Sequence, residues 1–195
     1  MKYTKLSKQN KSAVAMEAAE IIQKGGIVIL PFDTVYGLVC DPRNSRAVDK
    51  IFEFKNRPES KTLGLAVDSL ESMKKIAEIA LEKFIWDKIP GRFTFILPTK
   101  EIDFAQECYR DGTVAIRVPD NELVLNIAKE CNGVLAQTSA NISGQANCYS
   151  VDEIKSQAGD SIENIDLIID GGVLSQNPPS SIYDLTGKSP HQIER

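Results

Sequence analysis

Short apolar runs rich in valine, isoleucine and leucine alternate with helical segments along the chain. "AVAMEAAEIIQK" (13–24) is read as a helix that Ser12 can cap and that Gly25 and Gly26 end, and "IVIL" (27–30) follows as a β-branched run suited to a buried strand. Strands that alternate with helices are typical of an α/β sheet covered by helices.

The same reasoning predicts further strands at 63–67, 93–98, 113–118, 133–138 and 166–170, and further helices at 46–54 and roughly 121–131. Asn44 or Ser45 is expected to open the helix at 46–54, and "DSLE", which starts at Asp68, resembles a capping box for a helix beyond it. The irregular strand spacing in the middle of the chain leaves room for antiparallel pairs. We therefore expect an α/β fold with a single-domain twisted mixed sheet covered by helices.

Composition narrows the class of protein. The 195 residues, 42% of them hydrophobic, can close one substantial core. A formal net charge of −4 and a pI near 5.2 disfavour a dedicated RNA-binding protein, which would need a local basic patch. Residues 1–20 hold no apolar run of signal-peptide or membrane-span length, which predicts a cytoplasmic protein without a membrane partner.

The positions of the cysteines and of the histidine give little support for metal binding or nucleophilic catalysis. Cys40, Cys108, Cys131 and Cys148 are scattered, form no CxxC pair and have only His191 as a further soft ligand, so no metal site made of protein side chains is expected. We interpret the cysteines as reduced packing residues and His191 as structural or solvent-facing. The chain also lacks GxxxxGK[ST], GxGxxG and a convincing GxSxG with a histidine partner. These absences favour chemistry by positioning and charge neutralisation, as in phosphoryl or nucleotidyl transfer.

Four polar loops are candidates for that chemistry, since open α/β sheets bind ligands at strand ends. They are "PFDTVYGL" (31–38), the cationic "KNRPESK" (55–61), "QTSANISG" (137–144) and "NPPSSIYDL" (177–185). Taken alone, the first could be a plain turn, the second a solvated basic turn and the third a serine or asparagine turn that caps a helix. Together they indicate a polar pocket lined by cations.

Five segments in the same order resemble one known family. "PFDTVYGL", "KNRPESKTL", "VAIRVP", "TSANISG" and "PSSIYDL" are similar to P-T-D-T-x-Y-G-L, K-x-R-P-x-x-K-P-L, V-x-x-R-x-P, the S-x-N segment and P-S-T-x-x-D-L of the YrdC-like (TsaC-type) L-threonylcarbamoyladenylate synthases. The resemblance runs from about residue 14 to residue 195. It implies a YrdC-like fold over 1–195 without the additional C-terminal domain of longer members. It also implies formation of threonylcarbamoyl-AMP and pyrophosphate from ATP, L-threonine and bicarbonate, for threonylcarbamoyl-adenosine in tRNA.

The family's site residues carry over by motif position. The resemblance implies catalytic roles for Lys55 and Arg57, with Mg²⁺ entering through the ATP phosphates. The residues implied to contact ATP are Lys55, Arg57, Lys61, Thr113, Asn141 and Arg195. The residues implied to hold threonine are Thr34, Arg117, Ser139 and Ser180. Arginine forks suit phosphate and carboxylate oxygens, and hydroxyl groups can recognise an amino acid.

Some positions depart from the family pattern, and other functions stay open. Phe32 replaces a threonine, Thr62 replaces a proline, and Ala66 stands where some relatives carry a histidine, so the shape of the amino-acid pocket is open. One alternative is an RNA-binding or ribosome-maturation module without turnover. Another is the carbamoyl-adenylate chemistry of the related domain in hydrogenase maturation factors. Expected partners are the downstream threonylcarbamoyl-transferase machinery and, through a weak contact, tRNA.

Strand alternation separately predicts the face of the strand on which Arg117 lies. In "TVAIRVP", Val114, Ile116 and Val118 share one face of the strand, whereas Thr113, Ala115 and Arg117 share the other. Arg117 therefore points away from the most apolar face. It is either a surface charge or a ligand arm at the edge of the sheet.

Overall fold

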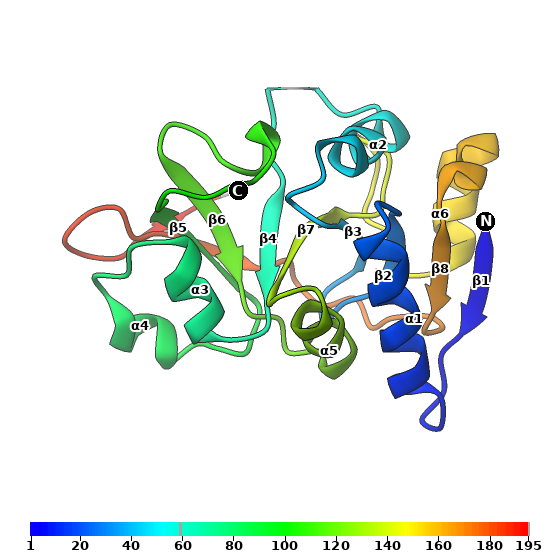
Figure 1. Cartoon of the computed structure of the whole chain (residues 1–195), viewed down its shortest axis with the longest axis horizontal. Coiled ribbons are helices and arrows are strands. Elements are labelled where there is room, and N and C mark those ends of the chain that lie inside the picture. The colour runs from blue at the N-terminus through cyan, green and yellow to red at the C-terminus, as the bar shows by residue number, and fades with distance from the viewer. Residues whose placement is uncertain (59, 195) are drawn as a thin grey trace.

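A mixed β-sheet with helices on both faces organises the computed structural model, which describes residues 1–58 and 60–194 (Figure 1). The strands are β1 (Lys2–Lys5), β2 (Val28–Pro31), β3 (Tyr36–Cys40), β4 (Gly64–Val67), β5 (Phe93–Pro98), β6 (Thr113–Arg117), β7 (Val134–Ser139), β8 (Leu167–Asp170), β9 (Ser181–Asp184) and β10 (His191–Ile193). The helices are α1 (Lys11–Gln23), α2 (Ser45–Lys55), α3 (Leu70–Ile76), α4 (Glu82–Trp86), α5 (Glu122–Glu130) and α6 (Val151–Ala158), with 3₁₀ turns at Gln106–Cys108 and Gly159–Asn164. The predicted α/β class is confirmed.

The strands lie in the order β1-β8-β2-β3-β7-β4-β6-β5-β9-β10. The β1/β8, β2/β8, β4/β6 and β5/β9 pairs are parallel, and the β2/β3, β3/β7, β4/β7, β5/β6 and β9/β10 pairs are antiparallel. The predicted mixed sheet is therefore confirmed. Segments 63–67, 93–98, 113–118, 133–138 and 166–170 each form a strand within one residue of the predicted bounds.

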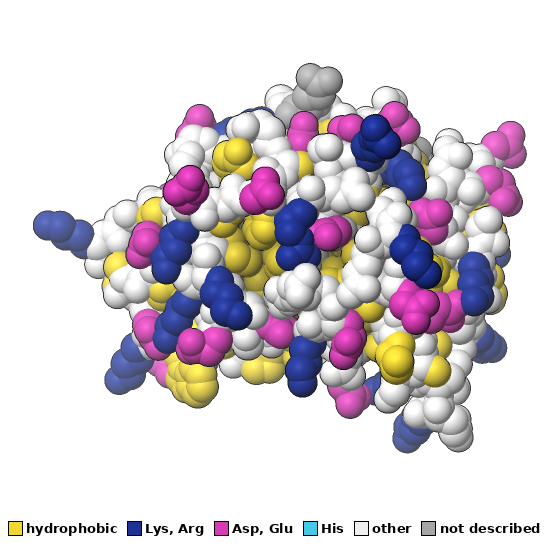
Figure 2. All heavy atoms as spheres, viewed as in Figure 1, with side chains coloured by type: hydrophobic (Ala, Val, Ile, Leu, Met, Phe, Trp, Pro, Cys, Tyr) yellow, Lys and Arg dark blue, Asp and Glu magenta, His cyan; other side chains and the backbone are white. Residues whose placement is uncertain are grey.

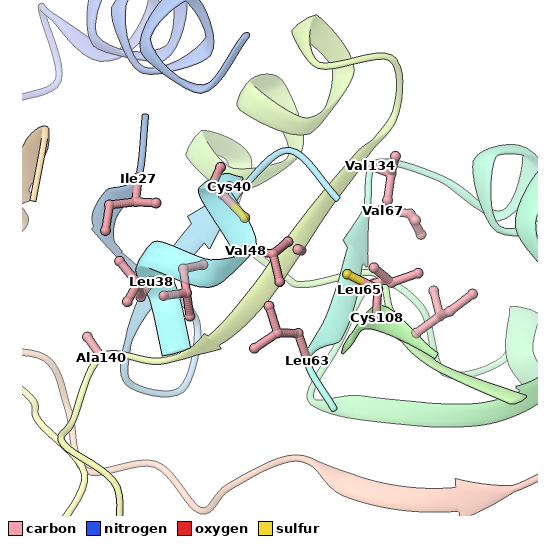
Figure 3. Packing of buried hydrophobic residues seen from close by; sticks show 14 of the residues in the cluster. Ile27, Leu38, Cys40, Val48, Leu63, Leu65, Val67, Cys108, Val134 and Ala140 are labelled. Atoms are coloured by element: carbon pink, nitrogen blue, oxygen red, sulfur yellow. The ribbon is translucent and has the colours of Figure 1, made fainter. Parts of the chain in front are cut away.

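Strand alternation divides the core between the two faces of the sheet. One cluster takes the buried residues of α2, α3 and α6, together with Val114 and Ile116 of β6. Figure 3 shows part of it, with Val48 of α2 among Leu38, Leu65 and Cys108. The other cluster takes the buried residues of α1 and α5. Strands β2, β3, β4, β7 and β8 thus send alternate side chains to opposite layers of helices, as the pleat requires.

Two predicted helix caps are wrong. α1 begins at Lys11 with Asn10 at its N-cap, so Ser12 lies inside the helix. The helix after "DSLE" is capped by Ser69, whose hydroxyl accepts a hydrogen bond from the Ser72 backbone N–H at 3.1 Å. Asp68 is displaced from the cap because the chain turns into the helix one residue later than the motif suggests. The cap predicted at Asn44 is confirmed, since its side chain accepts from the Ala47 N–H at 3.1 Å.

Several elements were not predicted. The segment 31–38, expected to be a loop, contributes Pro31 to β2 and Tyr36, Gly37 and Leu38 to β3, because the two strands form a hairpin. β1, α4, α6, β9 and β10 are further additions. All four cysteines are free and buried, which confirms their assignment as packing residues, and His191 is exposed in β10. Among the described residues, no helix has the length and apolar character needed to cross a membrane.

Candidate functional site

A cavity of about 230 Å³ lies between strands β4, β5, β6 and β7 and the segments around Thr34, Asn147 and Ser180. It contains all four residues expected to hold threonine, although these come from four segments far apart in the sequence. The lining residues are Thr34, Val35, Gly64, Thr94, Arg117, Gln137, Thr138, Ser139, Asn147, Pro179 and Ser180. The expected threonine-binding group is therefore a spatial cluster.

Strand alternation explains the polar wall of this cavity. Phe95 of β5, Ile116 of β6 and Ala136 of β7 point into the cluster of α2, α3 and α6. Their neighbours Thr94, Arg117 and Gln137 consequently project from the opposite face, and all three line the cavity. From β4, Gly64 lines the cavity, and a Cβ there would meet the Gln137 amide nitrogen at 2.8 Å. A glycine thus keeps the cavity open beside Gln137.

Arg117 is neither a surface charge nor simply a side chain extended into solvent. Only 4% of its side chain is exposed, and its Nη2 donates to the two carboxylate oxygens of Asp33 at 2.6 and 2.7 Å. Asp33 comes from the β2–β3 turn and also accepts from the Asp120 backbone N–H at 3.3 Å. Arg117 still lines the cavity, so a carboxylate bound there would share the guanidinium with Asp33 or displace it.

Lys55, the last residue of α2, points inward to the loop that follows β7. Only 1% of the residue is exposed, and its Nζ donates to the Ser139 and Asn141 carbonyl oxygens and to Asn141 Oδ1 at 3.4 Å. Burial, together with the charges of Arg57 and Lys61, lowers the pKa of Lys55 to about 7, although Cys148 acts in the opposite direction. Asn141 Oδ1 also accepts from the Ser139 hydroxyl at 2.5 Å. Lys55, Ser139 and Asn141 form one hydrogen-bonded group.

None of the other described residues expected to contact ATP lines this cavity. Arg57 lines a separate hollow of about 370 Å³ beside Phe52 and Glu107, and its Nη2 donates to the Thr62 carbonyl at 2.6 Å. Burial lowers the pKa of Arg57. Lys61 is exposed, and the Thr113 hydroxyl donates to the Arg110 carbonyl at 2.8 Å. Arg195 lies outside the described residues.

Several residues in or beside the cavity received no role from the sequence alone. Asp33 stood in a quoted motif but received no role, because its partner Arg117 is 84 residues away. Thr94 could have been found as a polar position inside the strand run 93–98, on the same alternation as Arg117. Gln137 belonged both to the predicted strand 133–138 and to the polar segment 137–144 and received no role, and it lies in β7. We find no sequence signal for Asn147.

A second cavity, of about 730 Å³, lies next to the first. Asp33 forms part of its wall, and Pro179 lines both cavities. The remaining residues of its wall are Gly91, Arg92, Phe93, Asp120, Asn177, Pro178 and Ser181. The Asp33–Arg117 ion pair thus stands between the two cavities, with Arg117 on one side and Asp33 on the other.

Charges of both signs are mixed on the face of the molecule that Figure 2 shows. Figure 2 shows lysine, arginine and acidic side chains interspersed over one face, with hydrophobic side chains at the floor of a hollow near its centre. No continuous basic surface is visible in that view. Within residues 1–58 and 60–194, no three His, Cys, Asp or Glu side chains are grouped so that they could hold a metal ion.

Comparisons with known proteins identify relatives of this chain. The family model for the Sua5/YciO/YrdC domain, described as "Telomere recombination", matches residues 20–195. An uncharacterised protein of Haemophilus influenzae is 32% identical over 178 residues, which cover 89% of this chain and 84% of that protein. The threonylcarbamoyl-AMP synthase of Vibrio vulnificus is 30% identical over 173 residues, which cover 86% and 91% of the two chains.

Solved structures show the same fold. P. abyssi Sua5 complexed with L-threonine superposes with a TM-score of 0.85 at 29% identity, covering 98% of this chain and 56% of that one. This chain therefore spans just over half the length of that Sua5 protein. E. coli YciO superposes with a TM-score of 0.82 at 25% identity, covering 98% and 93%. The matched family model, the relatives and the shared fold together show that this chain belongs to the Sua5/YciO/YrdC family.

Proposed function

We propose that the protein is a cytoplasmic L-threonylcarbamoyladenylate synthase that acts in threonylcarbamoyl-adenosine modification of tRNA. The observation that carries the proposal is that Thr34, Arg117, Ser139 and Ser180 line one cavity of about 230 Å³. These are the positions that the family motifs assign to threonine. A V. vulnificus relative is a threonylcarbamoyl-AMP synthase, and the P. abyssi Sua5 structure was determined with L-threonine, which supports the same substrate.

The cavity offers suitable chemistry for an amino acid. The Arg117 guanidinium can hold a carboxylate through parallel hydrogen bonds, and the Thr34, Ser139 and Ser180 hydroxyls can meet the ammonium or hydroxyl group of threonine. ATP would lie next to it, extending past Asn141 towards Arg57 and Lys61, with Thr113 and Arg195 as further contacts. Mg²⁺ bound to the ATP phosphates would offset their charge.

The proposed reaction balances as follows. The threonine amine combines with bicarbonate and releases water, which gives a carbamate. A carbamate oxygen then attacks the α-phosphorus of ATP, and the bond from that phosphorus to the oxygen bridging to the β-phosphate breaks, so that pyrophosphate leaves. The protein's part is to position the carbamate and the α-phosphate and to neutralise charge as pyrophosphate forms.

Pyrophosphate release from ATP tests the proposal when threonine and bicarbonate are omitted in turn. We expect release only when both are present, together with a product of the mass of threonylcarbamoyl-AMP. Release supported by carbamoyl phosphate in place of threonine would favour carbamoyl-adenylate chemistry. RNA binding without turnover would favour the binding module, and direct transfer to the downstream machinery can be tested once the product is identified.

A further inference from the structure

Lys55 occupies an unusual place for a cation expected to meet phosphate. It ends α2, and Asn56 follows with φ 48°, which turns the chain sharply away from the helix. The side chain lies under the loop that follows β7, and only 1% of the residue is exposed. Lys55 is not among the residues that line the cavity, whereas Ser139 is.

The hydrogen-bonding capacity of the ammonium group is filled by that loop. A charged lysine has three N–H donors, and Lys55 Nζ has three oxygen acceptors, namely Ser139 O, Asn141 O and Asn141 Oδ1. The backbone adds a fourth link, because the Ser143 N–H donates to the Lys55 carbonyl at 2.9 Å. A phosphate contact would therefore require Lys55 to give up a bond to the loop.

We infer that Lys55 is a positioning residue, whose ammonium group fixes the backbone from Ser139 to Asn141 so that the Ser139 hydroxyl faces the cavity. The part of this inference that concerns threonine binding rests on the proposed function. Ser139 ends β7 and Asn141 lies in the loop beyond it, and oxygens of both residues meet at the Lys55 nitrogen, so the loss of that nitrogen removes a link between the strand end and the loop. The acceptors around Nζ are amide oxygens without formal charge. Burial and the charges of Arg57 and Lys61 disfavour the charged form of Lys55, and Cys148 favours it.

The wild-type protein gives a first test by amine acetylation and mass spectrometry. Lys61, which is exposed and belongs to the same cationic loop, serves as the internal control. Without ATP, we expect Lys55 to react at least about 10-fold more slowly than Lys61, because burial keeps the reagent from its nitrogen even though the lowered pKa leaves more of that amine neutral. Labelling of Lys55 as fast as that of Lys61, with protection on addition of Mg-ATP, would mark Lys55 as a phosphate ligand and overturn the inference.

A pair of variants gives the second test. Lys55→Met keeps an apolar stem and removes all three donors, and Lys61→Met makes the same change at an exposed cation. Hydrogen exchange of the peptide covering residues 139–145 should rise in Lys55→Met and stay unchanged in Lys61→Met. Equal exchange in both variants would overturn the inference. This readout needs no substrate, so it stands even if the proposed function fails.

Threonine affinity without ATP separates positioning from phosphate contact. By calorimetry with L-threonine as the probe, Lys55→Met should bind at least about 5-fold more weakly than wild type, as expected for the loss of about one hydrogen bond in the cavity. Lys61→Met should bind as wild type does. Unchanged threonine affinity in Lys55→Met would count against the inference, whereas absence of threonine binding in the wild type would count against the proposed function instead.

Discussion

Arg117 Nη2 lies 2.6 Å from Oδ1 and 2.7 Å from Oδ2 of Asp33, and the two side chains are only 4% and 7% exposed. The pair joins the end of β6 to the β2–β3 turn. Removing both charges from water is costly, and close contact with further hydrogen bonds is needed to offset that cost. Asp33 also accepts a hydrogen bond from the Asp120 N–H. The ion pair thus holds in place the Arg117 side chain, on which the proposed amino-acid site depends.

Asp33→Asn should lower the free energy of unfolding by about 3–5 kcal/mol, because it leaves the Arg117 charge buried without a carboxylate. Urea unfolding followed by circular dichroism measures this. Asp120→Asn is the matched control, since Asp120 is exposed nearby and contacts Asp33 through its backbone. A cost in Asp33→Asn no larger than in the control would show that the pair does not stabilise the fold.

Arg117→Lys should raise the KM for threonine about 10-fold or more, corresponding to about 1.4 kcal/mol, because a lysine replaces two parallel hydrogen bonds with a point charge. ATP affinity without threonine should change little. Threonine titration at saturating ATP and bicarbonate, normalised to folded protein, gives the result. Arg92→Lys, at an exposed arginine of the neighbouring cavity, should leave KM unchanged. An unaltered KM in Arg117→Lys would remove Arg117 from the amino-acid site.

Local patterns predicted the central strands but not what covers them. β5 and β6 follow from β-branched, alternating runs, and the same alternation correctly put Arg117 opposite Ile116. Its burial was missed because Asp33, from a turn 84 residues earlier, covers it. β1, "KYTK", has no apolar run, and it forms through backbone pairing with β8 at the end of the sheet. Pairing between strands this far apart in the sequence cannot be detected in a short stretch of residues.

The site was predicted in part for the same reason. Motif positions found Thr34, Arg117, Ser139 and Ser180, which the fold brings to one cavity. The cation cluster was read as one group from its spacing in "KNRPESK", yet the αL turn at Asn56 separates its members. Lys55 turns inward before that residue, and Arg57 faces a different hollow after it. Spacing shows how close residues are along the chain, but the turn at Asn56 sets the direction in which the Lys55 and Arg57 side chains point.

Ser139→Ala should weaken chiefly threonine binding, and Asn141→Ala chiefly ATP binding, because only Ser139 of the two lines the cavity. The two changes should not be additive, since the Ser139 hydroxyl donates to Asn141 Oδ1 at 2.5 Å. Separate titrations of the two substrates, with the double variant, measure this. Ser143→Ala is the control in the same loop, because its buried hydroxyl has no hydrogen-bond partner. Lower melting temperatures with intact turnover per folded molecule would instead make the loop a structural turn.

Gly37→Ala should destabilise the protein by about 1–3 kcal/mol through overpacking. A Cβ at Gly37 would lie 2.4 Å and 2.5 Å from two ring carbons of Phe32, which is itself only 5% exposed. In a Phe32→Thr background the same change should cost less, because the opposing ring is gone. Urea unfolding of the four proteins gives the coupling energy. Strictly additive costs would show that the ring moves aside without strain.

The last prediction concerns pH and Lys55, whose pKa in the folded protein is about 7 and whose ordinary value is 10.5, with burial as the main cause. Between these two values the unfolded chain holds a proton on this amine that the folded protein has lost, so the folded amine then donates two hydrogen bonds to the loop instead of the three of the ammonium form. Unfolding therefore takes up a proton, and stability rises with pH in this window. Below about pH 7 both states are protonated, so this contribution becomes independent of pH.

Relative to Lys55→Met, which cannot titrate, the wild type should gain up to ~1.4 kcal/mol per pH unit between about pH 7.5 and about pH 9.5. Urea unfolding of the two proteins across that range isolates the contribution, because every other titrating group is common to both. Parallel stability curves would mean that Lys55 stays charged in the folded protein up to its ordinary pKa, so that the oxygens of Ser139 and Asn141 hold the ammonium form strongly enough to offset burial.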